Sequence, residues 1–154
     1  MDIGSNNKGV AGRLSNFTPR KFIFDGIECN SMEGLLQSFK FENEEIQKEV
    51  CKLTGFAAKR RGRKRNKAWQ TKQTLWWKGI EYPRKSKEYQ QLLISAYKAY
   101  GENEKVRNDL ISTNNAVFKH SIGNNKASET VLTTREFCRL LTDLRNSYKK
   151  DKLF

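Results

Sequence analysis

The regular spacing of apolar residues over segment 87–100 is the feature that most constrains the fold. These residues recur every three or four positions, which places them on one broad face of a helix: Tyr89, Leu92, Leu93, Ala96, Tyr97 and Tyr100. Segments 44–53 and 104–111 show the same pattern over shorter lengths, and a further helix is predicted to begin at Thr133, where Glu136 completes a capping box. Helices with one apolar face must bury it against other elements, so we expect a mostly helical domain.

One short stretch interrupts the helical pattern. Asp25-Gly26 stands between two apolar runs and predicts a β-hairpin of strands 22–24 and 27–29. A length of 154 residues favours one domain. The fold class we predict is α+β, a single mostly helical domain over residues 12–154 with a small β-hairpin or sheet. Residues 1–11 are polar and glycine-rich, and we expect a flexible N-terminus there.

Segment 30–41 combines helix signals with a line of polar side chains. Asn30 is a good N-cap residue, and Glu33 falls three positions later, as in a capping box. Glu33, Gln37 and Lys40 lie within about 60° of one another on such a helix, beside an apolar stripe. They could form the wall of a polar pocket. The alternative is a capping glutamate with two solvated neighbours.

Positive charge is concentrated in one segment. The net charge is +13, and residues 59–67 hold seven basic side chains and no acidic one. The rest of the chain has 23 basic against 17 acidic residues, so about half of the excess lies in these nine positions. A phosphate-bearing partner is one interpretation, and a solvated loop is the other.

Cysteine and histidine usage argues against a metal site. Cys29, Cys51 and Cys138 form no CxxC pair, and His120 is the only histidine, so we expect neither a metal nor another cofactor. An odd cysteine count without an evident signal peptide indicates a reducing, cytoplasmic location. No apolar run approaches the ~18 residues of a membrane span, so we expect no membrane partner.

Adjacent tryptophans suggest a surface for aromatic stacking. Trp76 and Trp77 are core residues by default, but two neighbours do not easily face one core. One of them is a candidate platform for a nucleobase. With the clustered cations and the carboxylate of Glu33, this indicates a nucleotide-like ligand.

Several motifs resemble the NADAR family, also called YbiA-like. They are Leu14-Ser15-Asn16-Phe17, Phe24-Asp25-Gly26-Ile27, Ser31-Met32-Glu33, Gln37 and Lys40-Phe41. That family has a Ser-Asn-Phe motif, an Asp-Gly hairpin and a helix of the pattern Glu-His-x-x-x-Gln-x-x-Lys-Phe. The likeness continues more weakly through Gly62-Arg63, Trp76/Trp77, Tyr97 and segment 110–123, so it covers most of the chain. Two departures stand out: Gly34 replaces the histidine, and segment 123–133 lacks the Gly-rich pattern of many members.

The resemblance implies cleavage of N-glycosidic bonds to ribose. In the most favoured form, the protein removes ADP-ribose from guanine in nucleic acid or nucleotides. The alternatives are cleavage of phosphoribosyl-aminopyrimidine intermediates of riboflavin synthesis, and a non-catalytic module that binds ADP-ribose or nucleic acid. Glu33 would be the catalytic carboxylate, stabilising an oxocarbenium-like state or activating water. Lys40 would be the second catalytic residue, either through a Schiff base with the opened ribose or as a positioning charge.

The remaining expected contacts are substrate-binding. Arg63 and Lys67 would hold phosphates, and Asn16 would hold ribose hydroxyls. The full set of expected substrate-binding residues is Arg13, Ser15, Asn16, Phe17, Gln37, Arg63, Lys67, Trp76, Trp77, His120 and Gly123.

Overall fold

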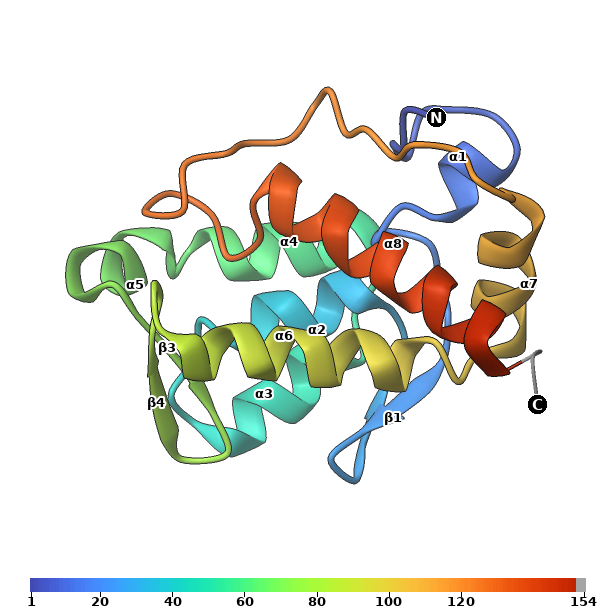
Figure 1. The fold of residues 1–154 in the computed structure, drawn as a ribbon. Helices are drawn as coiled ribbons and strands as arrows, with labels where there is room; N and C mark the ends of the chain where they lie inside the picture. The colour runs from blue at the N-terminus through green and yellow to red at the C-terminus, as the bar shows by residue number, and fades with distance from the viewer. Residues whose placement is uncertain (152–154) are drawn as a thin grey trace.

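The computed structural model describes residues 1–151, and its elements are mainly helices. In chain order they are α1 (Val10–Arg13), β1 (Phe22–Phe24), β2 (Ile27–Cys29), α2 (Met32–Ser38), α3 (Glu44–Cys51), α4 (Gly55–Arg63), α5 (Asn66–Lys72), β3 (Thr74–Trp77), β4 (Ile80–Pro83), α6 (Lys87–Tyr100), α7 (Glu104–Ser112) and α8 (Thr134–Asp151) (Figure 1). The predicted α+β class is confirmed.

Two separate antiparallel hairpins make up the β-structure. In the first, Phe24 pairs with Ile27 across Asp25 and Gly26, which both have positive φ. In the second, Trp77 pairs with Ile80 across Lys78 and Gly79, which also have positive φ. Two successive residues with φ > 0 match the twist of the strands on either side. The first hairpin was predicted, whereas the second was not, because Lys-Gly is a weaker turn signal than Asp-Gly.

Helix α2 lies at the centre of the domain, and all seven of its residues are buried. It packs against α3 and α4, while α6 packs against α8 (Figure 1). Gly34 permits the contact with α3: a Cβ there would lie 2.6 Å from the backbone oxygen of Leu53. A polar line on such a helix is therefore held inside the molecule.

The N-cap of α2 differs from the prediction. Ser31, rather than Asn30, caps the helix, and its Oγ accepts a hydrogen bond from the Gly34 amide at 3.0 Å. The Asn30 side chain instead donates to the backbone oxygen of Lys52 at 2.9 Å. Glu33 is thus free of any capping role at the position where we expected one. The capping box predicted for Thr133 and Glu136 is present in α8.

The N-terminal segment is packed against the rest of the domain, contrary to the expected flexibility. Ile3 is fully buried, and its amide donates to the backbone oxygen of Lys119 at 2.8 Å. Asp2 and Lys119 form a parallel β-bridge. One apolar side chain and a few backbone hydrogen bonds fasten a segment whose composition alone looks unstructured. The single domain therefore includes residues 1–11, and residues 152–154 lie outside the part that the structure describes.

Among the described residues, no helix is long and apolar enough to cross a membrane.

Candidate functional site

A cavity of about 340 Å³ lies between α2, α4 and the long connection from α7 to α8. Nine of the thirteen predicted site residues line it: Ser15, Asn16, Phe17, Glu33, Gln37, Lys40, Arg63, His120 and Gly123. The volume lies at the lower end of the range for small-molecule sites. Helix α2 carries the polar line, and the long connection closes the cavity. Their cavity-lining residues are about eighty positions apart in sequence, so the fold brings this site together.

Glu33 lies in the wall of the cavity on α2. Its side chain is only 9% exposed, and its Oε1 accepts a hydrogen bond from Gln37 Nε2 at 2.8 Å. Burial raises the pKa of Glu33, while the hydrogen bond from Gln37 and the charges of Lys40, Lys59 and His120 oppose the rise. The alternative of a solvated capping glutamate is wrong. A carboxyl with a raised pKa at a cavity wall suits proton transfer near neutral pH.

Lys40 lies farther along the same chain segment and lines the same cavity. Its ammonium donates to Asn66 Oδ1 on α5 at 2.6 Å. Within the described residues, it makes no ion pair with Glu33. Burial lowers the pKa of Lys40 to about 8, and the charges of Lys59 and Arg63 act in the same direction. A lysine in this state is partly neutral near physiological pH, as a nucleophilic amine must be.

The basic segment 59–67 spans the end of α4, a two-residue turn and the start of α5, and its cations have different partners. Lys59 and Arg63 line the cavity. Arg61 pairs with Glu49 at 3.6 Å, and Arg65 donates to the backbone oxygen of Lys40 at 3.2 Å. The interpretation of this segment as a loop is therefore wrong. Two of its cations are placed for a ligand in the cavity, and Arg61 and Arg65 are engaged elsewhere.

The Ser-Asn-Phe motif is fixed to α2 and α6. The Glu33 amide donates to the backbone oxygen of Asn16 at 3.0 Å, and Tyr97 Oη donates to Asn16 Oδ1 at 2.8 Å. Ser15 Oγ accepts from the Phe17 amide at 3.2 Å. These bonds place the motif beside the catalytic candidate. They hold Asn16 in position, and they leave its amide nitrogen available to a ligand.

His120 and Gly123 close the cavity from the long connection. His120 Nδ1 lies 2.7 Å from the backbone oxygen of Ile3, and the ring packs edge-on against Phe137 at 5.0 Å between centroids. A Cβ at Gly123 would lie 2.2 Å from Thr134 Oγ1 and 2.4 Å from the His120 ring, so only glycine fits there. The anchored N-terminal segment thus supports the cavity through His120.

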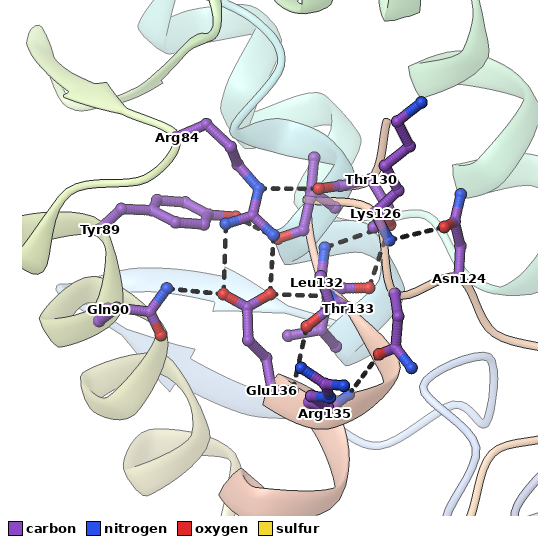
Figure 2. Close-up of polar contacts among 12 residues, drawn as sticks. Arg84, Tyr89, Gln90, Asn124, Lys126, Thr130, Leu132, Thr133, Arg135 and Glu136 are labelled. Atoms are coloured by element: carbon purple, nitrogen blue, oxygen red, sulfur yellow. Dashed lines mark hydrogen bonds and ion pairs between the residues drawn. The ribbon is translucent and has the colours of Figure 1, made fainter. Parts of the chain in front are cut away.

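A buried ion pair fastens the part of the connection that faces the cavity (Figure 2). Arg84, 1% exposed, donates to Glu136 Oε1 at 2.7 Å and Oε2 at 3.2 Å, and to the backbone oxygen of Thr130 at 2.8 Å. Gln90 also donates to Glu136, at 2.6 Å, and Tyr89 Oη donates to the backbone oxygen of Val131. Removing one partner of such a pair leaves a buried charge without compensation. We therefore assign these residues to holding the cavity wall in place.

Four predicted site residues lie elsewhere. Arg13 pairs with Asp109 at 3.0 Å, and Lys67 is exposed on α5 outside the cavity lining. Trp76 and Trp77 are each 3% exposed, and Trp77 donates through Nε1 to Asp25 Oδ2 at 3.0 Å. Both tryptophans are core residues, because the strand they share is covered on both faces. The predicted tryptophan platform for a base is wrong.

The family model described as bacteriophage protein GP30.3 matches residues 8–146 of this chain. The chain belongs to the GP30.3 family. A relative from Enterobacteria phage T4, an uncharacterized 17.1 kDa protein in the Gp30-rIII intergenic region, is 36% identical over 149 residues, covering 96% of this chain and 97% of the relative.

The fold is also that of a bacterial protein. The NMR structure of the E. coli protein YbiA superposes with a TM-score of 0.63, at 19% identity, over 98% of this chain and 84% of YbiA. The expected YbiA-like fold is confirmed.

Position 34 explains one departure of this GP30.3 family member from the NADAR-like helix pattern. Gly34 faces the last turn of α3, where a Cβ would lie within 3.0 Å of the backbone oxygens of Leu53, Val50 and Cys51. It is absent from the cavity lining, so glycine at this position removes no group from the cavity.

Several cavity residues were missed by sequence reasoning. Lys59 has a recognisable signal, because it lies four positions before Arg63 on one helical face. Asn66 has no recognisable sequence signal, since its hydrogen bond with Lys40 depends on how α5 packs beside Lys40. The missed residues also include Leu36 and members of the long connection: Ile122, Asn124, Glu129, Thr130, Val131 and Leu132. The described residues contain no group of three or more His, Cys, Asp or Glu side chains that could hold a metal ion.

Proposed function

We propose that this GP30.3 family member hydrolyses N-glycosidic bonds to ribose and that it removes ADP-ribose from guanine in nucleic acid or nucleotides. The observation that carries the proposal is the buried carboxyl of Glu33 in a cavity that also holds Lys40, with Lys59 and Arg63 lining the same cavity. This combination supplies a proton-transfer group for the sugar and cations for its phosphates in one place.

The reaction needs little more than these groups. When the bond from ribose C1′ to the base nitrogen breaks, positive charge develops on the sugar, and the bond electrons go to the base. Glu33 in its ionised form stabilises that charge or takes a proton from the attacking water, whose oxygen then bonds to C1′. The raised pKa of Glu33 makes the carboxylate a stronger base than an exposed glutamate.

Lys40 acts on the sugar from the same side of the cavity. Its ammonium hydrogen-bonds a ribose hydroxyl or a phosphate, as it now bonds Asn66. In the alternative, its neutral amine condenses with the aldehyde of the opened ribose, which releases water and forms a Schiff base that a second water hydrolyses. The pKa of about 8 is compatible with both roles.

The phosphates are assigned to Lys59 and Arg63, which line the cavity on α4. Arg60, Lys64 and Lys67 are exposed outside the cavity lining and are available to a nucleic-acid backbone. A small substrate would use the first two cations, whereas a polynucleotide would use the whole set.

The cavity volume favours a second candidate, the phosphoribosyl-aminopyrimidine intermediates of riboflavin synthesis. About 340 Å³ suits a phosphorylated ribose with one small ring better than a whole ADP-ribose group. An ADP-ribosyl substrate would have to extend beyond the cavity mouth.

The two substrates should be compared directly. An oligonucleotide carrying ADP-ribosyl-guanine and a phosphoribosyl-aminopyrimidine are incubated separately with the protein, and kcat/KM is measured for each. We expect the oligonucleotide to be the better substrate by at least about tenfold, which corresponds to about 1.4 kcal/mol of transition-state binding. A higher kcat/KM for the small substrate would transfer the proposal to the second candidate. Saturable binding without release of product from either would leave only the binding module.

A further inference from the structure

A pair of phenylalanines, one in the cavity lining and one exposed beside it, lies next to the cavity. Phe17 lines the cavity, and Phe56 on α4 packs edge-on against it with ring centroids 5.0 Å apart and an interplanar angle of 79°. The Phe56 side chain is 60% exposed. A phenylalanine this exposed loses most of the benefit of burial, so its contribution to the stability of the domain is small.

The same face of α4 carries the two cavity cations. Phe56, Lys59 and Arg63 are spaced by three and four residues, which keeps them within about 60° of one another around the helix. The Lys59 ammonium lies 5.9 Å from the centroid of the Phe17 ring. One helical face thus presents an aromatic ring and then two cations.

The position of this face is fixed by close packing behind it. A Cβ at Gly62 would lie 1.7 Å from Gln37 Oε1, so the backbone of α4 is directly against the polar line of α2. Gln37 in turn holds the Glu33 carboxyl. The aromatic pair, the cations and the carboxyl are therefore parts of one packed arrangement.

We propose that Phe17 and Phe56 form a platform for the base of a nucleoside diphosphate, whose diphosphate lies on Lys59 and Arg63. The distal base of the substrate thus lies outside the cavity, and only the ribose next to the scissile bond enters it. The inference rests on the proposed function, since it takes the cavity as the site of that ribose. It also accounts for a cavity smaller than the whole substrate, because stacking on an aromatic ring needs no enclosed volume.

The test measures binding without turnover. ADP and inorganic pyrophosphate are titrated into the wild type, Phe56→Ala and the control Ile94→Ala, which removes an equally exposed apolar side chain on α6. Because an aromatic side chain contributes substantially to base stacking, we expect Phe56→Ala to weaken ADP binding by about tenfold. Its pyrophosphate affinity and both affinities of Ile94→Ala should stay within about twofold of wild type. Lys59→Gln should weaken both ligands.

A second variant keeps an aromatic side chain at position 56, so its result does not depend on whether Phe56→Ala folds correctly. Phe56→Trp introduces an exposed indole, and its emission should be quenched by ADP but not by pyrophosphate. Equal ADP affinity in Phe56→Ala and wild type, or no saturable ADP binding by the wild type, would overturn the platform. Release of ADP-ribose from modified guanine, together with ADP binding that does not depend on Phe56, would refute the platform alone. Phe56-dependent ADP binding without any hydrolysis would refute the proposed function alone.

Discussion

Replacing Glu33 by glutamine separates catalysis from folding in a way that only a buried catalytic carboxyl should show. The amide keeps the volume of the side chain, and its oxygen can still accept the hydrogen bond from Gln37, which spans 2.8 Å in the wild type. It can neither take a proton nor balance a cationic sugar. Loss of such a group lowers the rate by about 10²–10⁴-fold, which is about 3 to 5 kcal/mol of transition-state stabilisation.

The Glu33→Gln variant should lose activity but gain thermal stability at neutral and higher pH. Burial raises the pKa of Glu33, so the folded protein favours the protonated carboxyl more than the unfolded chain does. The wild type therefore loses stability as the pH rises through the interval between the unfolded and the folded pKa. Glutamine has no charge to bury, so Glu33→Gln should melt at a higher temperature than wild type near pH 8, and this difference should shrink toward about pH 4.

The assay combines single-turnover release of ADP-ribose with thermal melting at several pH values. Glu45→Gln is the matched control, because Glu45 is an 81% exposed carboxylate on the surface of α3. Near-wild-type turnover in Glu33→Gln would refute the catalytic assignment. A melting temperature that falls at neutral pH would refute the account of a destabilising buried carboxylate.

Three further predictions test other parts of the site. The Lys40→Ala variant should turn over more than about tenfold more slowly than wild type, with little change in melting temperature. In the wild type, borohydride added during turnover should leave a mass adduct on Lys40 if this residue forms a Schiff base. Full activity of Lys40→Ala would remove Lys40 from the site. Replacing four arginines of the basic segment with glutamine should lower the slope of log K against log salt for polynucleotide binding by about one for each lost phosphate contact. The four are Arg60, Arg61, Arg63 and Arg65. We expect the slope to fall by nearer two than four, because Arg61 and Arg65 are engaged within the protein. An unchanged slope would mean that the segment is only solvated. Trp77→Ala should destabilise the fold by about 3–5 kcal/mol in chemical denaturation, and weaker ligand binding without loss of stability would restore the stacking role.

The sequence predicted the parts of the fold that depend on local signals. Apolar spacing located α6, and the Asp25-Gly26 turn located the first hairpin. Glu33 and Gln37 were correctly placed together, because a helix fixes their relative directions whatever surrounds it. Lys40 lines the same cavity from the turn just after α2, which ends at Ser38 and not at the predicted position 41. The burial of these side chains was the part left open, since it depends on α4 approaching α2 at Gly62.

The errors arose where distant segments meet. Residues 1–11 looked unstructured, but Ile3 finds a buried position beside segment 117–119. The paired tryptophans looked like one core residue and one ligand contact, yet strand β3 buries both of them, while its partner β4 stays largely exposed. The exposed ring next to the cavity is instead Phe56, which packs against the cavity residue Phe17 and whose environment has no signature in the local sequence.

The most direct test of the central claim is the identity of the products from an ADP-ribosylated guanine. A short oligonucleotide carrying one such base is incubated with the wild-type protein, and both products are identified by mass spectrometry. We predict free ADP-ribose together with an oligonucleotide whose guanine is restored, in stoichiometric amounts, and neither product with Glu33→Gln. Persistence of the modified oligonucleotide with the wild-type protein, or release of the base from the DNA with ADP-ribose still attached, would contradict the assignment.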